Sequence, residues 1–421
     1  MKTLITIVKT LVITALFYSC TSSQNQVSME KYKLEGLPLI GTFNNMEFYE
    51  GGISGMIYIP GTNMEFYLIN DRGPNLVMNE HPLANGENVK LFAFPDYSPK
   101  IFHTKLKDGN FYVKNVIPIK KPDGTTVSGL PFPGSSEEHQ ETAWYDLEGS
   151  IAGTDLWGFD FEAIALGNNN DLWVAEEYRT SVLNIDRKTG EIIAIYGPEL
   201  INEHYQPIDT IFKYRRPNRG FESVAVTPEG KVFAMLQSPM WNPTEEVGEV
   251  SRLVRILELN PKTGNTQMYL HEIPGAKNEI RIRDWKIADM TAINNHEFLV
   301  LEHATQGSES LMDVYKIDIR KATPISSEMF NGKTPEQLIN AENAREHGIE
   351  VVGKTHVLDL IANGYDSFFD KPEGLTIIDA KTIAIINDND YDADAPYKNA
   401  YIEQPGMETY LFVFTLTDKL Y

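Results

Sequence analysis

The chain has 421 residues, of which 42% are hydrophobic and 11% aromatic, and its formal net charge at pH 7 is −22. This composition is typical of a folded body with a sizeable core and excludes a disordered chain. The acidic balance repels nucleic acid and anionic lipid at long range and favours cations, so we expect no nucleic-acid partner.

The first 20 residues have the pattern of an export signal. Lys2 and Lys9 precede an apolar run from Leu11 to Phe17, which is too short to span a bilayer permanently. Cys20 follows the run and is the only cysteine in the sequence, so it forms no internal disulfide. Its position resembles a bacterial lipoprotein processing site, and a simple signal peptide is the alternative.

A domain organisation follows from this interpretation. Residues 1–19 are predicted to be a lipoprotein signal peptide, 20–30 a flexible tether, and 31–421 a single domain. A lipid on Cys20 would be the only contact with the membrane. We therefore expect a monomer anchored in the cell envelope at the outer membrane, with its body on the periplasmic or the surface face.

One pattern recurs along the predicted domain. Each copy reads as a short apolar strand, a tight polar turn and a second apolar strand. Glycine and asparagine stand in the turns, where a positive φ is needed. The copies begin at Ile53, Asp160, Phe221, Ala288 and Pro372.

Outer strands follow the copies and predict the fold. Two further strands follow each of the first four copies, whereas the last is followed only by residues 409–416. Residues 31–41 could supply the missing strand and close a ring. Antiparallel four-stranded units in this arrangement predict an all-β fold, a β-propeller of five or six blades. A sixth unit could occupy 121–160, which reads more like a loop insertion, and a helical insertion is expected at 333–348.

Alignment of the copies places acids at two strand positions. The start of the first strand lies beside the end of the second because the two are antiparallel. In a propeller the first strand lines the central channel, so both rows meet at one mouth. The first row is Ser54, Glu162, Glu222, Asp289 and Glu373, and the second is Asp71, Glu177, Gln237, His303 and Asp388.

These rows predict a calcium site. Neighbouring carboxylates raise one another's pKa, and a hard cation with oxygen ligands relieves this. The lack of cysteine and the scarcity of histidine in the rows argue against structural zinc. The predicted ligands are Asp71, Glu162, Glu177, Glu222, Asp289, Glu373 and Asp388, with the number of ions left open. The alternative is that the acids pair with the nearby bases Arg72, Arg179, Arg219 and Lys371.

The same bases permit a second interpretation. Guanidinium groups beside a metal grip phosphate and stabilise the charge of phosphoryl transfer. Salt bridges would use the same residues, and the sequence does not separate the two.

Several segments together resemble the "esterase-like activity of phytase" family, over about residues 52–390. They are Asp160-Phe-Glu162-Ala-Ile, Trp173-Val-Ala-Glu176-Glu177-Tyr, Gly220-Phe-Glu222, Leu299-Val-Leu-Glu302, Pro372-Glu373-Gly374 and Asn387-Asp388-Asn389-Asp390. The resemblance implies a β-propeller and calcium-assisted hydrolysis of phosphoric or other esters. The departures at Ser54, Gln237 and His303 leave fewer carboxylates than a full double ring.

A reaction scheme follows as an expectation. Metal held by the acids orients a phosphate and lowers the pKa of water. Arg72 and Arg179 neutralise developing charge, and His303 or an acid protonates the leaving oxygen. The substrate would be a small anion or ester. Two alternatives stay open: a metal-dependent lactonase or esterase, and a non-catalytic envelope binding protein stabilised by calcium.

Overall fold

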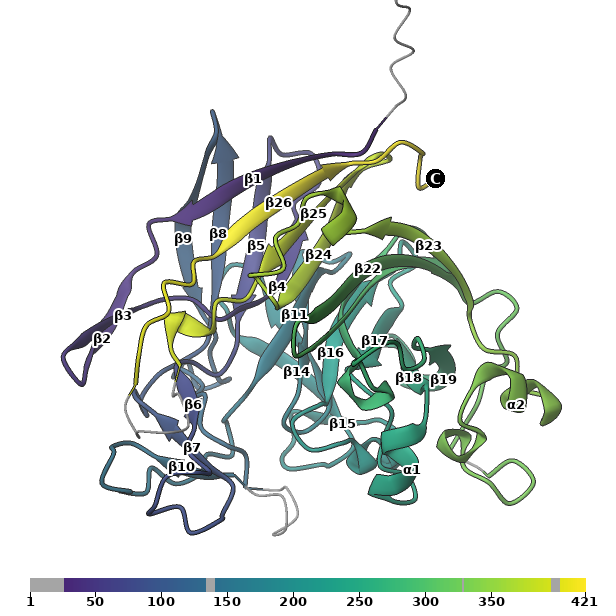
Figure 1. The fold of residues 1–421 in the computed structure, drawn as a ribbon, viewed down its shortest axis with the longest axis horizontal. Helices are drawn as coiled ribbons and strands as arrows, with labels where there is room; N and C mark the ends of the chain where they lie inside the picture. The colour runs from purple at the N-terminus through teal and green to yellow at the C-terminus, as the bar shows by residue number, and fades with distance from the viewer. Residues whose placement is uncertain (1–25, 134–140, 328, 395–401) are drawn as a thin grey trace, which may run out of the picture.

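The computed structural model describes residues 26–133, 141–327, 329–394 and 402–421, and it is built almost entirely of β-strands (Figure 1). The predicted signal peptide and Cys20 lie outside these residues. No helix in the described ranges is long and apolar enough to cross a membrane.

Each of the five predicted strand–turn–strand copies is an antiparallel hairpin in the structure. Apolar residues fill both strands because both are covered by neighbouring sheets. The hairpins are β4–β5 (Ile53–Tyr58, Glu65–Asn70), β11–β12 (Phe161–Leu166, Asp171–Glu176), β16–β17 (Phe221–Val226, Val232–Leu236), β20–β21 (Lys286–Ala292, Glu297–Gln306) and β24–β25 (Pro372–Asp379, Thr382–Asn387).

Two outer strands extend each hairpin to four antiparallel strands, and we number these groups sheets 1 to 5 in the order of their hairpins. The outer strands of sheets 1 to 4 are β8–β9 (Lys100–Lys107, Asn110–Pro118), β13–β14 (Ser181–Asp186, Ile192–Gly197), β18–β19 (Leu253–Asn260, Asn265–Glu272) and β22–β23 (Glu309–Asp318, Gly353–Asp359). A parallel edge strand, β15 (Tyr205–Pro207), adds to sheet 2.

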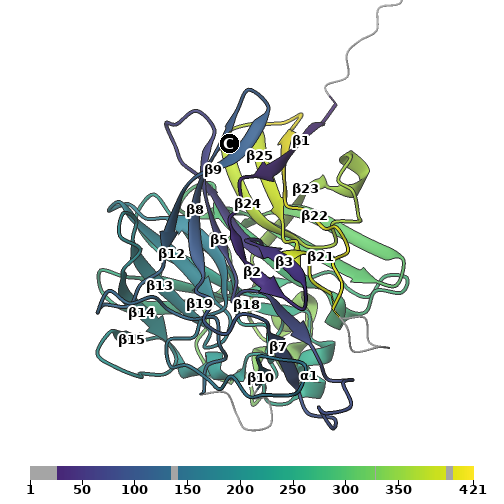
Figure 2. The same cartoon turned by 90° about the vertical axis from the view of Figure 1, so that its left-hand side faces the viewer.

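The first strands of the five sheets contact one another in a closed series. β4 contacts β11, β11 contacts β16, β16 contacts β20, β20 contacts β24, and β24 contacts β4 again. The architecture is therefore propeller-like, with the first strands innermost (Figures 1 and 2). The first strands all begin at one end of this ring, which we call its mouth.

Sheet 5 is completed from the opposite end of the chain. Its third strand is β26 (Tyr410–Thr415), and its fourth is β1 (Ser28–Glu35), which pairs antiparallel with β26. The end of β1 also pairs in parallel with β9, which joins sheets 5 and 1 at their edges. The predicted N-terminal closing strand is thus present, but it spans Ser28–Glu35 instead of the predicted 31–41.

Smaller elements lie outside the five sheets. β2–β3 (Leu39–Phe43, Met46–Tyr49) form a hairpin, and β6, β7 and β10 (Asn75–Val77, Val89–Phe92, Thr142–Trp144) form a three-stranded sheet. The described part of 121–160 contains β10 and loops, with no further four-stranded sheet. Residues 333–348 contain a 3₁₀ turn (Pro335–Leu338) and α2 (Ala341–Glu346). A further helix, α1 (Glu245–Val250), lies in the segment that connects β17 and β18 of sheet 3.

The turn at Pro335–Leu338 is tied to sheet 3 by a buried ion pair. Arg255 donates to both carboxylate oxygens of Glu336, at 2.7 and 3.0 Å, and neither side chain is exposed. Asn242 donates to the same carboxylate, so its charge is fully compensated.

Removal of β1 tests the closure. A chain beginning at Gly36 leaves the edge of β26 unpaired and the contact between sheets 5 and 1 unmade. Its thermal unfolding midpoint should lie at least about 10 °C below that of a chain beginning at Gln26. Equal midpoints for the two chains would show that β1 does not stabilise the ring.

Candidate functional site

A β-bulge at the same place in every first strand directs the side chains of the first acidic row. The pairing of each hairpin skips one residue close to the strand start, and a bulge turns that side chain away from the regular alternation. The skipped residues are Ser54, Glu162, Glu222, Ala288 and Glu373.

The bulge in sheet 4 corrects one predicted ligand. The skipped residue is Ala288, so Asp289 is one position out of register with Glu162 and points elsewhere. Its carboxylate accepts the backbone N–H groups of Met290 and Leu375, both at 2.7 Å, and therefore ties β20 to β24. Asp289 does not line the cavity described next, and we assign it to the scaffold.

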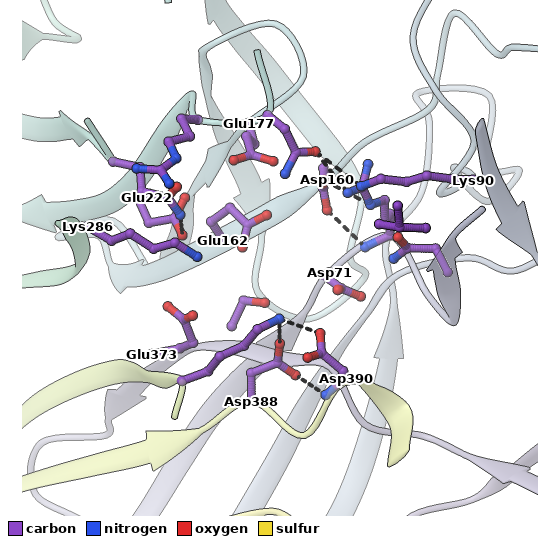
Figure 3. A pocket seen from close by; sticks show the side chains of 18 of the residues that line it. Asp71, Lys90, Asp160, Glu162, Glu177, Glu222, Lys286, Glu373, Asp388 and Asp390 are labelled. Atoms are coloured by element: carbon purple, nitrogen blue, oxygen red, sulfur yellow. Dashed lines mark hydrogen bonds and ion pairs between the residues drawn. The ribbon is translucent and has the colours of Figure 1, made fainter. Parts of the chain in front are cut away.

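The row residues open into a cavity of about 450 Å³ at the mouth of the channel (Figure 3). Three of its carboxylates lie on first strands, namely Glu162, Glu222 and Glu373 of sheets 2, 3 and 5. The others lie in the segments that connect strands: Asp71, Asp160, Glu177, Asp388, Asp390 and Asp394. Its cations are Arg72, Lys90, Arg216, Arg219, Lys286 and Lys371. Six of the seven predicted metal ligands therefore meet in one place.

Three carboxylates converge most closely. One oxygen each from Asp160, Glu162 and Glu177 lies within 4.8 Å of the others. The carboxylates of Glu162 and Glu177 form no hydrogen bond or ion pair with a described residue, whereas the carboxylate of Asp160 is held by Arg72, whose Nε lies 3.2 Å from Oδ2. The sequence analysis missed Asp160, although it directly precedes the apolar strand that carries Glu162.

Burial and mutual repulsion raise the pKa values of these acids. Burial raises the pKa of Glu177 to about 7, with Asp160 adding to the effect. The pKa of Glu162 is raised well above its ordinary value by burial and then by Asp160 and Glu222. Burial and the nearby Asp388 raise the pKa of Asp71 in the same way. Bringing these carboxylates together therefore costs free energy that a bound cation would offset.

A second part of the wall comes from sheet 5. The ammonium group of Lys371 pairs with Asp388, at 3.4 Å, and with Asp390. Burial and Asp390 raise the pKa of Asp388 to about 7, and burial raises that of Glu373 to about 8. Asp390 begins three consecutive residues with positive φ, at 46°, 57° and 54°, a strained turn that ends at Asp392.

The side chain of Tyr391 anchors this turn from below. It is 3% exposed, and its hydroxyl donates to that of Tyr97, which in turn donates to Glu50. Asp392 accepts the backbone N–H groups of Gly406 and Met407, which hold the end of the turn. Both contacts stabilise the position of the preceding Asp388 and Asp390.

The two arginines predicted to neutralise phosphate charge are already engaged. Arg72 lines the cavity, but its guanidinium pairs with Asp160 and with Glu141 at 2.9 Å, and it donates to Asn218. Arg179 does not line the cavity. It donates to the carbonyls of residues 156 and 158 and lies 3.9 Å above the ring of Phe159. Arg72 therefore positions Asp160, and Arg179 packs between loops.

His303 is also displaced from its predicted role. It is 3% exposed and does not line the cavity. Burial, reinforced by Lys286, holds its pKa well below the ordinary value. A histidine kept neutral in this way is a poor proton donor, so an acid of the cavity is the better candidate.

The residues present fit a hard cation. The donors at the convergence point are all carboxylate oxygens, which Ca²⁺ prefers, and the described residues that line the cavity include no cysteine or histidine. Oε2 of the buried Glu222, which lines the same cavity, has no hydrogen-bonded partner among the described residues. An orphaned buried carboxylate oxygen costs free energy unless a proton or a cation satisfies it.

Fold and site together define a propeller-like protein with a buried acidic cluster in a cavity at the mouth of its channel. The family model described as "Phytase-like: Esterase-like activity of phytase" matches residues 49–391. The chain therefore belongs to this phytase-like family.

Matches to individual proteins have low sequence identity to this chain. An "Uncharacterized secreted protein" of Arthroderma benhamiae is 26% identical over 219 residues, which cover 45% of this chain and 40% of that protein. The alignment thus spans about two fifths of that relative. Among solved structures, one reported for the GH130 family of mannoside phosphorylases is 9% identical with a TM-score of 0.42, covering 92% of this chain and 94% of the other. A protein of unknown function from Dyadobacter fermentans is 11% identical with a TM-score of 0.35, over 93% and 99%.

Paired substitutions test the register. Asp289→Ala leaves two buried N–H groups unpaired and should lower the free energy of unfolding by about 2 kcal/mol, while calcium affinity changes by less than about threefold. Glu162→Gln should weaken calcium at least about tenfold without lowering the stability of the calcium-free protein. Urea unfolding in chelator and calcium titration calorimetry measure both. A loss of calcium affinity in Asp289→Ala equal to that in Glu162→Gln would contradict the assignment.

The raised pKa values predict the pH dependence of stability. Folded Glu177 and Glu373 keep protons that the unfolded chain releases near pH 4.5, so stability falls as pH rises through pH 7 to about 8. In chelator the melting midpoint should drop by on the order of 5 °C between pH 5 and pH 8, and calcium should reduce the drop. A melting midpoint that rises from pH 5 to pH 8 in chelator would show that the pKa values of Glu177 and Glu373 are not raised in the folded protein.

Proposed function

We propose that this protein is a calcium-dependent hydrolase of small esters, phosphate esters first, acting in the cavity at the mouth of a five-bladed propeller. The observation that carries the proposal is the convergence of oxygens from Asp160, Glu162 and Glu177 within 4.8 Å. The closed series of first-strand contacts supports the five blades, and membership of the phytase-like family supports ester hydrolysis.

The acidic cluster would hold the ion. Asp160, Glu162 and Glu177 are the proposed ligands, with Asp71 and the free oxygen of Glu222 as further donors in the same cavity. Calcium bound there would supply a positive charge that polarises an ester oxygen and lowers the pKa of water.

The chain's own residues would carry the other roles. Arg72 keeps Asp160 at the cluster through its ion pair, so its contribution is positional. Glu373 lines the cavity, and its pKa of about 8 leaves a proton on its carboxyl near neutral pH. It is the side chain best suited to donate a proton to the leaving oxygen, in place of His303.

Two alternatives are distinguished by substrate. A metal-dependent lactonase or esterase would use the same cluster on an uncharged substrate. A non-catalytic binding protein would use calcium for stability only and would hydrolyse neither phosphate esters nor uncharged esters and lactones. Nine carboxylates and six cations line the cavity, so attraction of an anionic ester depends on the bound calcium ion together with the lining cations that have no carboxylate partner among the described residues.

We further propose that the protein is exported by residues 1–19, lipidated on Cys20 and held as a monomer at the outer membrane. The secreted relative supports export.

Phosphate release from phytate and from a simple phosphomonoester, by protein covering residues 21–421, tests the function. Calcium should support release, and chelation should reduce it at least about tenfold. Glu162→Gln should lower kcat/KM at least about 100-fold, or about 2.7 kcal/mol of transition-state stabilisation. Glu229→Gln, exposed on the turn between β16 and β17, is the control and should match the unaltered protein. Release that survives both chelation and Glu162→Gln would refute the proposal, whereas turnover of lactones alone would favour the first alternative.

A further inference from the structure

The cavity cations divide into two groups by their partners. Four of the six are ion-paired: Arg72 with Asp160 and Glu141, Lys90 with Glu141, Arg216 with Glu249, and Lys371 with Asp388 and Asp390. Arg219 and Lys286 are the two lining cations that form no ion pair with a carboxylate of the described residues.

Arg219 is fixed by neutral oxygens. Its Nη1 donates to the hydroxyl of Ser238 at 2.6 Å and to the carbonyls of Arg283 and Trp285 at 3.2 and 3.3 Å. Nε and Nη2 donate to no described residue. One edge of the guanidinium is thus anchored, while the rest of its donors are available to the cavity.

Lys286 lies at the strand position of sheet 4 that corresponds to Asp160 in sheet 2, and the sequence analysis did not identify it as a site residue. It is the first residue of β20, one residue before the strand position that Phe161 fills in sheet 2, so it corresponds to Asp160. Its ammonium group forms no hydrogen bond or ion pair within the described ranges. In Figure 3 its side chain extends into the cavity near Glu222 and Glu373.

The two cations are also close enough to disfavour each other. Burial lowers the pKa of Lys286, and the charge of Arg219 lowers it further. Burial likewise lowers the pKa of Arg219 to about 10. The carboxylates of Glu373 and Glu222 raise the pKa of Lys286, but neither forms an ion pair with it. An anion placed between Lys286 and Arg219 would give both cations a direct partner.

We propose that Arg219 and Lys286 form a receptor for a phosphate group of the ligand, on the side of the cavity built by sheets 3 and 4. A guanidinium edge and an ammonium group together match the charge and the several acceptor oxygens of phosphate. The three carboxylates that converge most closely, Asp160, Glu162 and Glu177, lie on or beside strands of sheet 2, so the receptor is built by different sheets. That the ligand is a substrate rests on the proposed function; that it carries phosphate does not.

The binding of inorganic phosphate tests the receptor without any turnover. Calorimetric titration of the calcium-loaded protein should show saturable binding, which Lys286→Gln and Arg219→Gln each weaken at least about tenfold. Lys286→Arg should retain affinity within about threefold. Lys90→Gln, which removes a lining lysine that already has a carboxylate partner, is the matched control and should also stay within about threefold.

Calcium affinity of the same variants separates binding from folding. Loss of a positive charge from the cavity should leave calcium affinity in Lys286→Gln equal or higher, whereas a damaged fold would weaken calcium and phosphate together. Phosphate affinity unchanged in Lys286→Gln, or reduced equally in Lys90→Gln, would overturn the receptor.

The receptor and the reaction fail in different ways. Phosphate binding that depends on Lys286 in a protein that hydrolyses no ester would retain the receptor and remove the proposed function. Calcium-dependent hydrolysis with phosphate binding that does not depend on Lys286 would do the opposite.

Discussion

Repulsion among carboxylates at one mouth of the ring is the constraint on which the rest of this structure depends. Five first strands begin around one channel, and bulges in four of them direct a polar row residue into the same space. Like charges in a partly buried cavity raise one another's pKa, which disfavours the folded state near neutral pH. The wall therefore needs fixed counter-charges, and a cation at the cavity centre would lower this cost further.

The scaffold answers the first need with residues that are themselves satisfied. Glu176, one residue before Glu177, accepts hydrogen bonds from the backbone of Tyr178 and Arg179 and from the hydroxyl of Ser181, so it fixes the strand end and is unavailable as a ligand. Arg72 and Lys371 neutralise particular acids and hold them in place. Some polar groups of the cavity have no hydrogen-bonded partner in the described part of the chain: the carboxylates of Glu162 and Glu177, the ammonium of Lys286, and Nε and Nη2 of Arg219. These groups are what a ligand can use.

Most of the fold can be predicted from local sequence patterns. The hairpins, their outer strands and the closing N-terminal strand were all predicted, because alternating apolar residues and turn glycines are read within a few residues. Asp289 was wrongly predicted to be a metal ligand. The bulge in sheet 4 falls at Ala288, and because alanine has no polar side chain, the sequence does not show that Asp289 is one residue out of register. Arg179 was misplaced because the direction of a long side chain depends on tertiary contacts. Glu141 comes from a distant loop, and no periodic pattern predicts its contact with Arg72.

Diffraction from crystals soaked in calcium, or in a lanthanide that replaces it and scatters anomalously, tests the central claim most directly. The account predicts an anomalous peak about 2.3–2.6 Å from oxygens of Asp160, Glu162 and Glu177. Saturating metal that leaves these three carboxylates without a peak, or that binds only elsewhere on the protein, would contradict it.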